Sequence, residues 1–487
     1  MRRGIRRCFF AAVVPAVAGA CTGERPSSPT VRLEYFQVNL DPSTMSDVES
    51  RGIATLLHAG LVAVDSSGRV EPRLAVSWRK SDSLTWEFQL KRGVRFTNGA
   101  PANAQAVVKS LCWSMQPSHL YSWALRSIAH SSGAGGQVKC DGLVALNDST
   151  MRIRESRPAQ WLLEAFDSPA GWIVGDPGAK APAWGERPGV GPFRLGTVLT
   201  GSQVTLVRRD SGVAVAQVDS VRFKHIPDPL ASAAEMGAGA IDFMRVDAPA
   251  LAQVLRQRGV ALHRHGFGRV RMLLANPTAL AKRGFSAAQV TVLLAGISAA
   301  VDRAAIAREI GDVARPLLTA FPPAAAGLAT APPTTALATL PTATLRAITA
   351  NDPLSDAIGS RLPRRVGSVT ISHNALDPSL LFSQFLAGDT DLMSIMIEPT
   401  LNAPAFWAAF WLAGSPFVAF GRELARADTI DLTTAAGVRS FAAAVDAKGN
   451  WVGLVSEDGR IAVSQRLAGL RFTRSGQVSF EGITVTR

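Results

Sequence analysis

The stretch LTWEFQLKRGVRFTNGAP, residues 84–101, decides the fold class because it joins a strand, a turn and a helix entry. Its first half alternates apolar and polar side chains, which is the period of a half-buried strand. Gly93 interrupts the pattern, and Asn98-Gly99 supplies residues that tolerate positive φ before Pro101, a residue suited to a helix start. Residues 103–115 then have helical spacing. The same mixture of strands and helices along the chain predicts an α/β or α+β fold.

The N-terminal segment has the composition of an export signal. A basic run and then an apolar run precede Ala18-Gly19-Ala20-Cys21, which closes the segment with small residues before a cysteine. This tetrapeptide resembles a bacterial lipobox, which implies a signal peptide over residues 1–20, lipidation of Cys21, and a Ser/Pro-rich tether over residues 21–30. The alternative is an ordinary signal peptide cleaved after Ala20. The lipid form places the protein in the cell envelope, anchored to a membrane and facing the periplasm or the exterior.

The rest of the chain is expected to be soluble and outside the cytoplasm. No later segment reaches the roughly 18 consecutive apolar residues that a membrane-spanning helix needs. Once the cysteines of the signal peptide and of the lipid site are set aside, Cys112 and Cys140 remain as an even pair in an oxidising compartment. A disulfide between them and two buried free thiols are both compatible with this spacing, because cysteine is often buried without pairing.

The formal charge of +13 does not predict a nucleic-acid partner. Four of the arginines lie in the leader, and the others are spread singly among acidic residues, so no basic stripe forms. The sequence has no RNA-binding aromatic signature and no Cys/His finger. The charge therefore indicates an arginine-rich composition, with at most weak attraction to anionic envelope surfaces.

Several short motifs follow one another in an order that is informative. They are Leu40-Asp41-Pro42, residues 59–62 (AGLV), residues 72–78 (PRLAVSW), residues 86–96 (WEFQLKRGVRF), Asn98-Gly99, Gly191-Pro192-Phe193, residues 239–243 (GAIDF), Val301-Asp302-Arg303 and residues 467–470 (LAGL). In this order they resemble the family 5 extracellular solute-binding proteins of ABC importers, the group that includes the oligopeptide-, dipeptide- and nickel-binding proteins. The resemblance implies a two-lobe, periplasmic-binding-protein-like α/β fold of type II, with an extra subdomain in lobe 1 and a hinge between the lobes.

The resemblance also implies a division of the chain. Lobe 1 covers residues 31–265 and includes a peripheral subdomain at about residues 51–185. Lobe 2 covers residues 266–452, and residues 453–487 return to lobe 1. Such proteins bind a small-molecule or peptide ligand between the lobes and present the closed form to ABC permease subunits. We therefore expect a monomer without a cofactor, held at the membrane by its lipid.

The second lobe departs from the family pattern. Residues 316–353 are a low-complexity run of Ala, Pro and Thr. The tryptophan and aspartate with which peptide binders of this family capture a ligand's amino group are also missing. Glu398 is the nearest carboxylate, and Asn402 and Trp407 follow it as polar and aromatic lining. The alternative is that the aromatic side chains form the core of a buried helix, because aromatics at helical spacing usually pack inward.

The predicted ligand site lies between the lobes, where a two-lobe chain has its largest concave surface. Met45 and Tyr121, one of only two tyrosines, are expected to contribute from lobe 1. Glu398, Asn402 and Trp407 are expected to contribute from lobe 2. Glu398 would pair with a ligand cation, so the sequence predicts a short peptide or another cationic solute with amide groups.

The sequence gives little support for an enzymatic function. The sequence has no Gly-x-Ser-x-Gly elbow, no His-Glu-x-x-His helix and no phosphate-binding Gly-x-x-x-x-Gly-Lys loop, so no catalytic residue is assigned. His263 and His265 would point the same way on a strand, but they lack further ligands nearby, which favours a solvated strand end over a metal site. Two other functions stay open: a degenerate binding protein that acts as a ligand sensor or envelope scaffold, and an exported hydrolase with a dispersed site.

Overall fold

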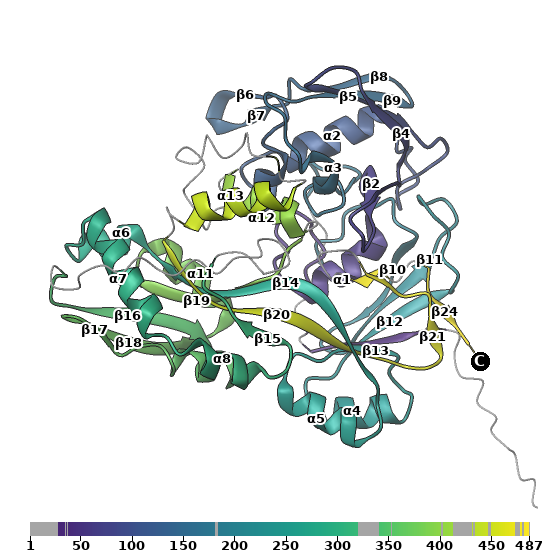
Figure 1. Cartoon of the computed structure of the whole chain (residues 1–487). Coiled ribbons are helices and arrows are strands. Elements are labelled where there is room, and N and C mark those ends of the chain that lie inside the picture. Colours follow the sequence, from purple (N-terminus) through teal and green to yellow (C-terminus); the bar gives the residue numbers. More distant parts are fainter. Residues whose placement is uncertain are drawn as a thin grey trace, which may run out of the picture.

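The computed structural model describes residues 28–34, 36, 38–180, 184–319, 340–351, 353–400, 403–412, 431, 434–446, 450–472, 478–479 and 482–486. A twelve-stranded sheet runs through the described part in the order β10-β11-β12-β1-β13-β20-β14-β19-β16-β18-β17, and β15 pairs with β20 beside this path. Its strands are β1 (Thr30–Leu33), β10 (Phe193–Leu199), β11 (Gln203–Arg208), β12 (Ser220–His225), β13 (Phe243–Arg245), β14 (Leu262–Ala275), β15 (Ala314–Pro316), β16 (Ala343–Ala350), β17 (Arg365–Val366), β18 (Val369–Leu376), β19 (Leu392–Ile397) and β20 (Trp451–Val463). Helices cover this sheet, so the expected α/β class is confirmed (Figure 1).

Two long strands, β14 and β20, connect the two ends of the sheet (Figure 1). The start of β14, residues 262–265, pairs antiparallel with residues 459–462 of β20, which lie next to β13. The end of β14, residues 270–275, lies instead between β20 and β19. The chain therefore passes along these strands from a first half of the sheet, β1 and β10–β13, to a second half, β16–β19.

A bulge interrupts β14 at the point where it passes between the halves. His265 pairs with Gly459, and Arg269 pairs with Glu457. An advance of four residues along β14 therefore matches an advance of only two residues along β20. Gly268 in the bulge has φ +63°, a conformation that glycine adopts without the penalty other residues incur. The bulge thus interrupts the regular pairing of β14 with β20 where β14 passes from the first half to the second.

Capping residues fix the start of two of the three helices described in the first half. These helices are α1 (Val48–Leu57), α4 (Pro229–Gly237) and α5 (Pro249–Gln257). Asp47 caps α1 by accepting a 2.7 Å hydrogen bond from the Ser50 amide, and Asp228 caps α4 ahead of Pro229. The apolar faces of α1 and of the strands meet in a core that includes Ile53 and Phe223. The 239–243 motif places Asp242 there, where it accepts a hydrogen bond from the Thr30 amide at 2.8 Å.

The second half contains a break between two consecutive helices. Its helices are α6 (Pro277–Lys282), α7 (Ala287–Ala300), α8 (Arg303–Ile310), α10 (Pro353–Gly359) and α11 (Pro378–Ala387). The helices α7 and α8 are bent by 62°, because Val301 is extended and Asp302 caps a new helix. Arg303 then donates to the carbonyl oxygens of Leu317 and Gly453. This gives the Val301-Asp302-Arg303 motif a structural role.

The low-complexity run also holds more structure than its composition suggests. Within residues 316–353, β16 pairs parallel with both β18 and β19 and lies inside the second half of the sheet.

Among the described helices, no single one is long and apolar enough to cross a membrane; only the bent pair α7 and α8 meets that requirement by length and composition.

A small four-stranded sheet forms the peripheral part of the molecule, at the top of Figure 1. It has the order β4-β5-β9-β8, with β4 (Ala75–Lys80), β5 (Thr85–Leu90), β8 (Leu143–Asn147) and β9 (Thr150–Arg154), and α2 (Ala104–Ser114) lies nearby. The strand predicted in residues 84–101 is β5, where Phe88 and Leu90 are buried. Asn103 caps α2, and Gly99 has φ +85° in the turn before it. The strand, turn and helix entry predicted there are therefore confirmed.

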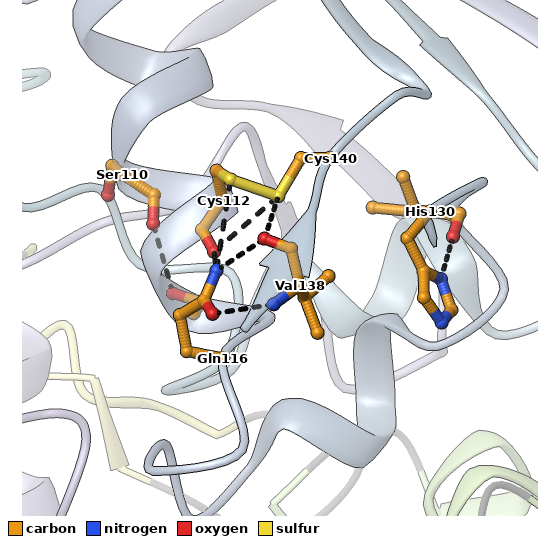
Figure 2. The surroundings of a disulfide bond; sticks show 8 residues. Ser110, Cys112, Gln116, His130, Val138 and Cys140 are labelled. Carbon is orange, nitrogen blue, oxygen red and sulfur yellow. Dashed lines mark hydrogen bonds between the residues drawn. A yellow bond between two sulfur atoms is a disulfide. The ribbon is translucent and has the colours of Figure 1, made fainter. Parts of the chain in front are cut away.

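A disulfide ties this helix to the segment that leads into β8 (Figure 2). The sulfur atoms of Cys112 and Cys140 are bonded, and the two residues are 28 positions apart in the sequence. The Gln116 side chain connects the same segments, because it donates to the carbonyl oxygens of Cys112 and Val138 at 3.0 Å and accepts from the Val138 amide at 2.9 Å. The peripheral sheet is thus braced at one edge by a covalent bond and three hydrogen bonds.

Candidate functional site

Glu398 lies at the centre of a buried ionic network. It directly follows β19, and its side chain is 4% exposed. Arg245, the last residue of β13, donates to its two carboxylate oxygens at 3.3 and 2.9 Å. Arg269 of β14 places Nε 3.3 Å from Oε2, and Arg51 of α1 places Nη2 3.9 Å from Oε1. Three arginines from the first half and from the connecting strand therefore surround one carboxylate from the second half.

The network continues along the connecting strands. Arg269 donates to Asp247 Oδ1 at 3.0 and 3.1 Å, and Arg271 pairs with Glu457 of β20. Burial alone would raise the pKa of Glu398, but the charges of Arg245 and Arg269 lower it to about 2. The pKa of Asp247 is also lowered against the effect of burial, by the same two arginines. These carboxylates are therefore ionised at neutral pH and balanced by the chain's own guanidinium groups.

Arg51 links this network to the peripheral part of the molecule. Its Nη1 donates to the Ser46 carbonyl oxygen and to the Tyr121 hydroxyl, both at 3.4 Å. The Tyr121 hydroxyl in turn donates to the Met45 carbonyl oxygen at 3.0 Å. Because Tyr121 directly precedes the short helix η1 (Ser122–Leu125), its hydroxyl joins the peripheral part to the loop before α1. Elements from all three parts of the structure thus meet at one guanidinium.

An aromatic helix closes one side of this region. The helix α12 (Ala403–Leu412) packs on η1, where the Trp123 ring contacts the rings of Phe406 and Phe410, with centroids 5.8 Å apart in both pairs. Trp407 is fully buried and stacks on Trp411 at a centroid distance of 6.5 Å. The aromatic side chains on this helix therefore pack inward, as the alternative interpretation of the sequence expected.

A second buried polar group lies beside α1. Arg187 donates to Asp41 Oδ2 at 2.9 Å and stacks on the Trp113 ring, 4.6 Å from its centroid. His58, which ends α1, and His119 are both buried near this pair. Burial lowers the pKa of His58 to about 4 and that of His119 to about 3. Both histidines are therefore neutral at physiological pH.

The structure brings together three of the five residues predicted to contact a ligand. Met45, Tyr121 and Glu398 are joined through Arg51 by the contacts given above. Trp407 lies in the aromatic packing of α12, and Asn402 lies outside the described residues, as does Cys21.

The arginines of the network escaped the sequence analysis. The available signal was a charged residue on the buried face of an amphipathic helix: Arg51 shares that face with Ala54, three positions further on. Arg245 and Arg269 gave no such signal, because each lies in a strand whose neighbours are known only after the sheet has formed. Among the described residues, no group of three or more His, Cys, Asp or Glu side chains is arranged to hold a metal ion.

Comparison with known proteins defines the class of this protein. Residues 69–353 match the bacterial extracellular solute-binding proteins, family 5 (Middle), and the chain belongs to this family. Its members bind solutes and are not enzymes, in agreement with the sequence analysis. The periplasmic oligopeptide-binding protein OppA of Escherichia coli K12 is 28% identical over 156 residues, which are 31% of this chain and 28% of OppA. That alignment spans less than a third of the relative's length.

Solved structures show the same fold over nearly the whole chain. Haemophilus influenzae OppA in complex with the peptide RPPGFSPFR has a TM-score of 0.76 at 14% identity, covering 95% of this chain and 100% of the other. The murein tripeptide-binding protein MppA of E. coli has a TM-score of 0.77 at 16% identity, covering 95% and 99%. The unliganded open form of MppA scores 0.62 at 15% identity, covering 94% and 97%. The periplasmic-binding-protein-like fold is therefore confirmed.

Proposed function

We propose that this chain is the solute-binding component of an ABC importer, which captures a peptide or similar small solute between two lobes for uptake through permease subunits. The meeting of Met45, Tyr121 and Glu398 around Arg51 carries the proposal. These residues come from both halves of the sheet and from the peripheral part, which is the arrangement that a solute enclosed between lobes requires. OppA of H. influenzae, which has the same fold, binds a nonapeptide.

The proposed lobes follow the division expected from the sequence. Lobe 1 comprises residues 31–265 with a subdomain at about 51–185, lobe 2 comprises residues 266–452, and residues 453–487 return to lobe 1. The passage of β14 and β20 between the two halves of the sheet supports these limits. The higher TM-score with the OppA peptide complex than with the open form of MppA favours a closed arrangement of the lobes.

The proposed solute site contains Met45, Tyr121, Glu398, Asn402 and Trp407. Titration calorimetry with pools of di- to pentapeptides tests this site on the full-length chain. We expect at least one pool to bind and X-ray scattering to show compaction on binding. Glu398→Ala should weaken binding at least about tenfold, because the guanidinium groups around the site lose the carboxylate that holds them in place. If no pool binds, or if the variant binds as well as the wild type, the proposed site is wrong.

Membrane attachment is a second part of the proposal. A lipid on Cys21 would hold the monomer at the envelope surface, facing the periplasm or the exterior, within reach of the permease. A multiply acylated cysteine anchors a protein stably, whereas a single chain gives marginal attachment. Cys21→Ala should therefore move the protein from the membrane fraction to the soluble fraction. A wild-type protein that is extracted without detergent and has an unmodified N-terminus would contradict the lipid anchor.

One observation favours an alternative function. Because Glu398 is already paired with three arginines of the chain, its carboxylate is not free to hold a ligand's amino group. A degenerate binding protein that acts as a ligand sensor or envelope scaffold would have this property. Loss of uptake of a bound solute on deletion of the gene supports transport, whereas unchanged uptake together with an envelope defect supports the scaffold.

A further inference from the structure

Arg51 differs from the other arginines of the network in how well its donors are used. Arg245 reaches Glu398 at 2.9 Å, Arg269 reaches Asp247 at 3.0 Å, and Arg271 pairs directly with Glu457. Among the described residues, the hydrogen bonds of the Arg51 guanidinium are both 3.4 Å long and go to a backbone carbonyl and to a hydroxyl. Its Nε has no hydrogen-bond partner in the part of the chain that the structure describes. Arg51 is therefore a buried arginine of this network that has donor capacity to spare.

Burial makes this spare capacity costly. The Arg51 side chain is only 7% exposed, and a guanidinium has five N–H donors that water satisfies in the unfolded chain. A buried charged donor that lacks an acceptor costs more free energy than a buried neutral donor that lacks one. Glu398 does little to relieve this, because both of its oxygens accept from Arg245 while Arg51 stays 3.9 Å away.

The location of Arg51 points to an acceptor that comes from outside the chain. It lies where α1, the loop at Ser46, Tyr121 and the residue after β19 meet. The Nε–H and an Nη–H of the Arg51 guanidinium lie side by side. This fork of two parallel N–H groups matches the two oxygens of a carboxylate.

We propose that Arg51 binds a carboxylate group of the solute, with the Tyr121 hydroxyl beside it. The inference rests on the proposed function, since it takes the solute to lie between the lobes, and it names the chemical group that is recognised. It also reverses the charges expected from the sequence, because here the protein supplies the cation and the ligand supplies the anion. A monoanion is favoured over a phosphate dianion, because the fixed negative charge of Glu398 lies 3.9 Å from Arg51.

Acid and amide forms of one probe test the recognised group. Tri-alanine with a free carboxyl terminus and tri-alanine amide are titrated into the full-length chain by calorimetry. We expect the acid to bind at least about tenfold more tightly than the amide, because the amide cannot accept a charge-assisted pair of hydrogen bonds from the guanidinium. Arg51→Gln should reduce this ratio to about one. Equal binding of acid and amide by the wild type overturns the inference.

Arg187→Lys is the matched control. It alters a buried arginine of the same region, but Arg187 is paired with Asp41 and has no contact with Glu398 among the described residues. We expect the acid-to-amide ratio to remain as in the wild type. A ratio that falls equally in Arg187→Lys and in Arg51→Gln would mean that the effect is a general disturbance of folding, and it would overturn the specific role of Arg51.

Acetate alone separates failure of this inference from failure of the proposed function. In protein labelled with ¹⁵N-arginine, the Nε–H signal that disappears in Arg51→Lys belongs to Arg51. Acetate should shift this signal in a saturable manner, while the signal of the exposed Arg69 stays in place. If neither tripeptide binds but acetate shifts the Arg51 signal, the carboxylate site at Arg51 is supported and the proposal that the solute is a peptide is wrong. If acetate leaves the Arg51 signal unchanged up to high concentration, the inference is wrong.

Discussion

Glu398 and Arg245 are 153 positions apart in the sequence, and their side chains are hydrogen-bonded at 2.9 and 3.3 Å. The pair joins the last residue of β13 to the residue that follows β19, so it connects the first half of the sheet to the second. Arg269 on the connecting strand contacts the same carboxylate at 3.3 Å. The contact between the two halves therefore depends on a charge balance as well as on apolar packing.

Removing that carboxylate charge should destabilise the protein strongly. We expect Glu398→Gln to lower the free energy of unfolding by about 3–5 kcal/mol, because it leaves buried guanidinium groups without their counter-charge. Urea denaturation measures the change. The matched control is Glu87→Gln on β5, whose partners Arg79 and Arg152 are 72% and 45% exposed, and it should cost less than about 1 kcal/mol. Equal effects of the two substitutions would contradict the importance of the buried network.

The buried histidines predict a loss of stability in mild acid. Burial lowers the pKa of His58 from 6.5 to about 4, so between these values the unfolded chain binds a proton that the folded chain does not. Stability therefore falls as the pH falls below 6.5, by about 2 kcal/mol per histidine between pH 7 and pH 5. His119 should contribute in the same direction.

His58→Asn tests this contribution. Urea unfolding at pH 7 and at pH 5 should show a smaller loss in the variant than in the wild type, because one of the two titrating groups has been removed. The same loss in both proteins would show that His58 does not govern this pH dependence.

The disulfide should matter for stability. The enclosed loop of 28 positions predicts a stabilisation of about 3–4 kcal/mol in the chain-entropy model, so reduction should lower the free energy of unfolding by about that amount. Intact mass after alkylation, with and without reductant, reports the pairing itself. Equal labelling of Cys112 and Cys140 in the two conditions would exclude the bond in the purified protein. The double variant Cys112→Ser and Cys140→Ser should be insensitive to reductant.

The bulge in β14 should tolerate only glycine at its turning point. Gly268 has φ +63°, so Gly268→Ala should cost about 1–2 kcal/mol of stability through backbone strain. Gly237, which ends α4, has no atom within 4 Å of an added Cβ, and Gly237→Ala is the control that should not destabilise. A Gly268→Ala variant as stable as this control would mean that the bulge relaxes without strain. Calorimetric unfolding of both variants makes the comparison.

The sequence by itself determined the local elements and the class of fold. The alternation over residues 84–90 gave β5, Asn103 gave the start of α2, and the order of the motifs indicated the solute-binding family that residues 69–353 match. These features succeed because they depend on neighbours a few positions away: side-chain period, capping and turn residues act within one element. The break between α7 and α8 was equally local, and Asp302 was its signal.

Only the tertiary structure decided what the predicted site residues touch. Glu398 was expected to meet a ligand cation, yet it meets Arg245 and Arg269, which come from strands more than 120 positions earlier in the chain. Whether a carboxylate is available to a ligand depends on the charges that the fold brings within about 4 Å of it, and the sequence does not state those distances. The same reason hid Arg51: its buried helix position was readable, but the unused donor Nε became evident only once its neighbours were in place.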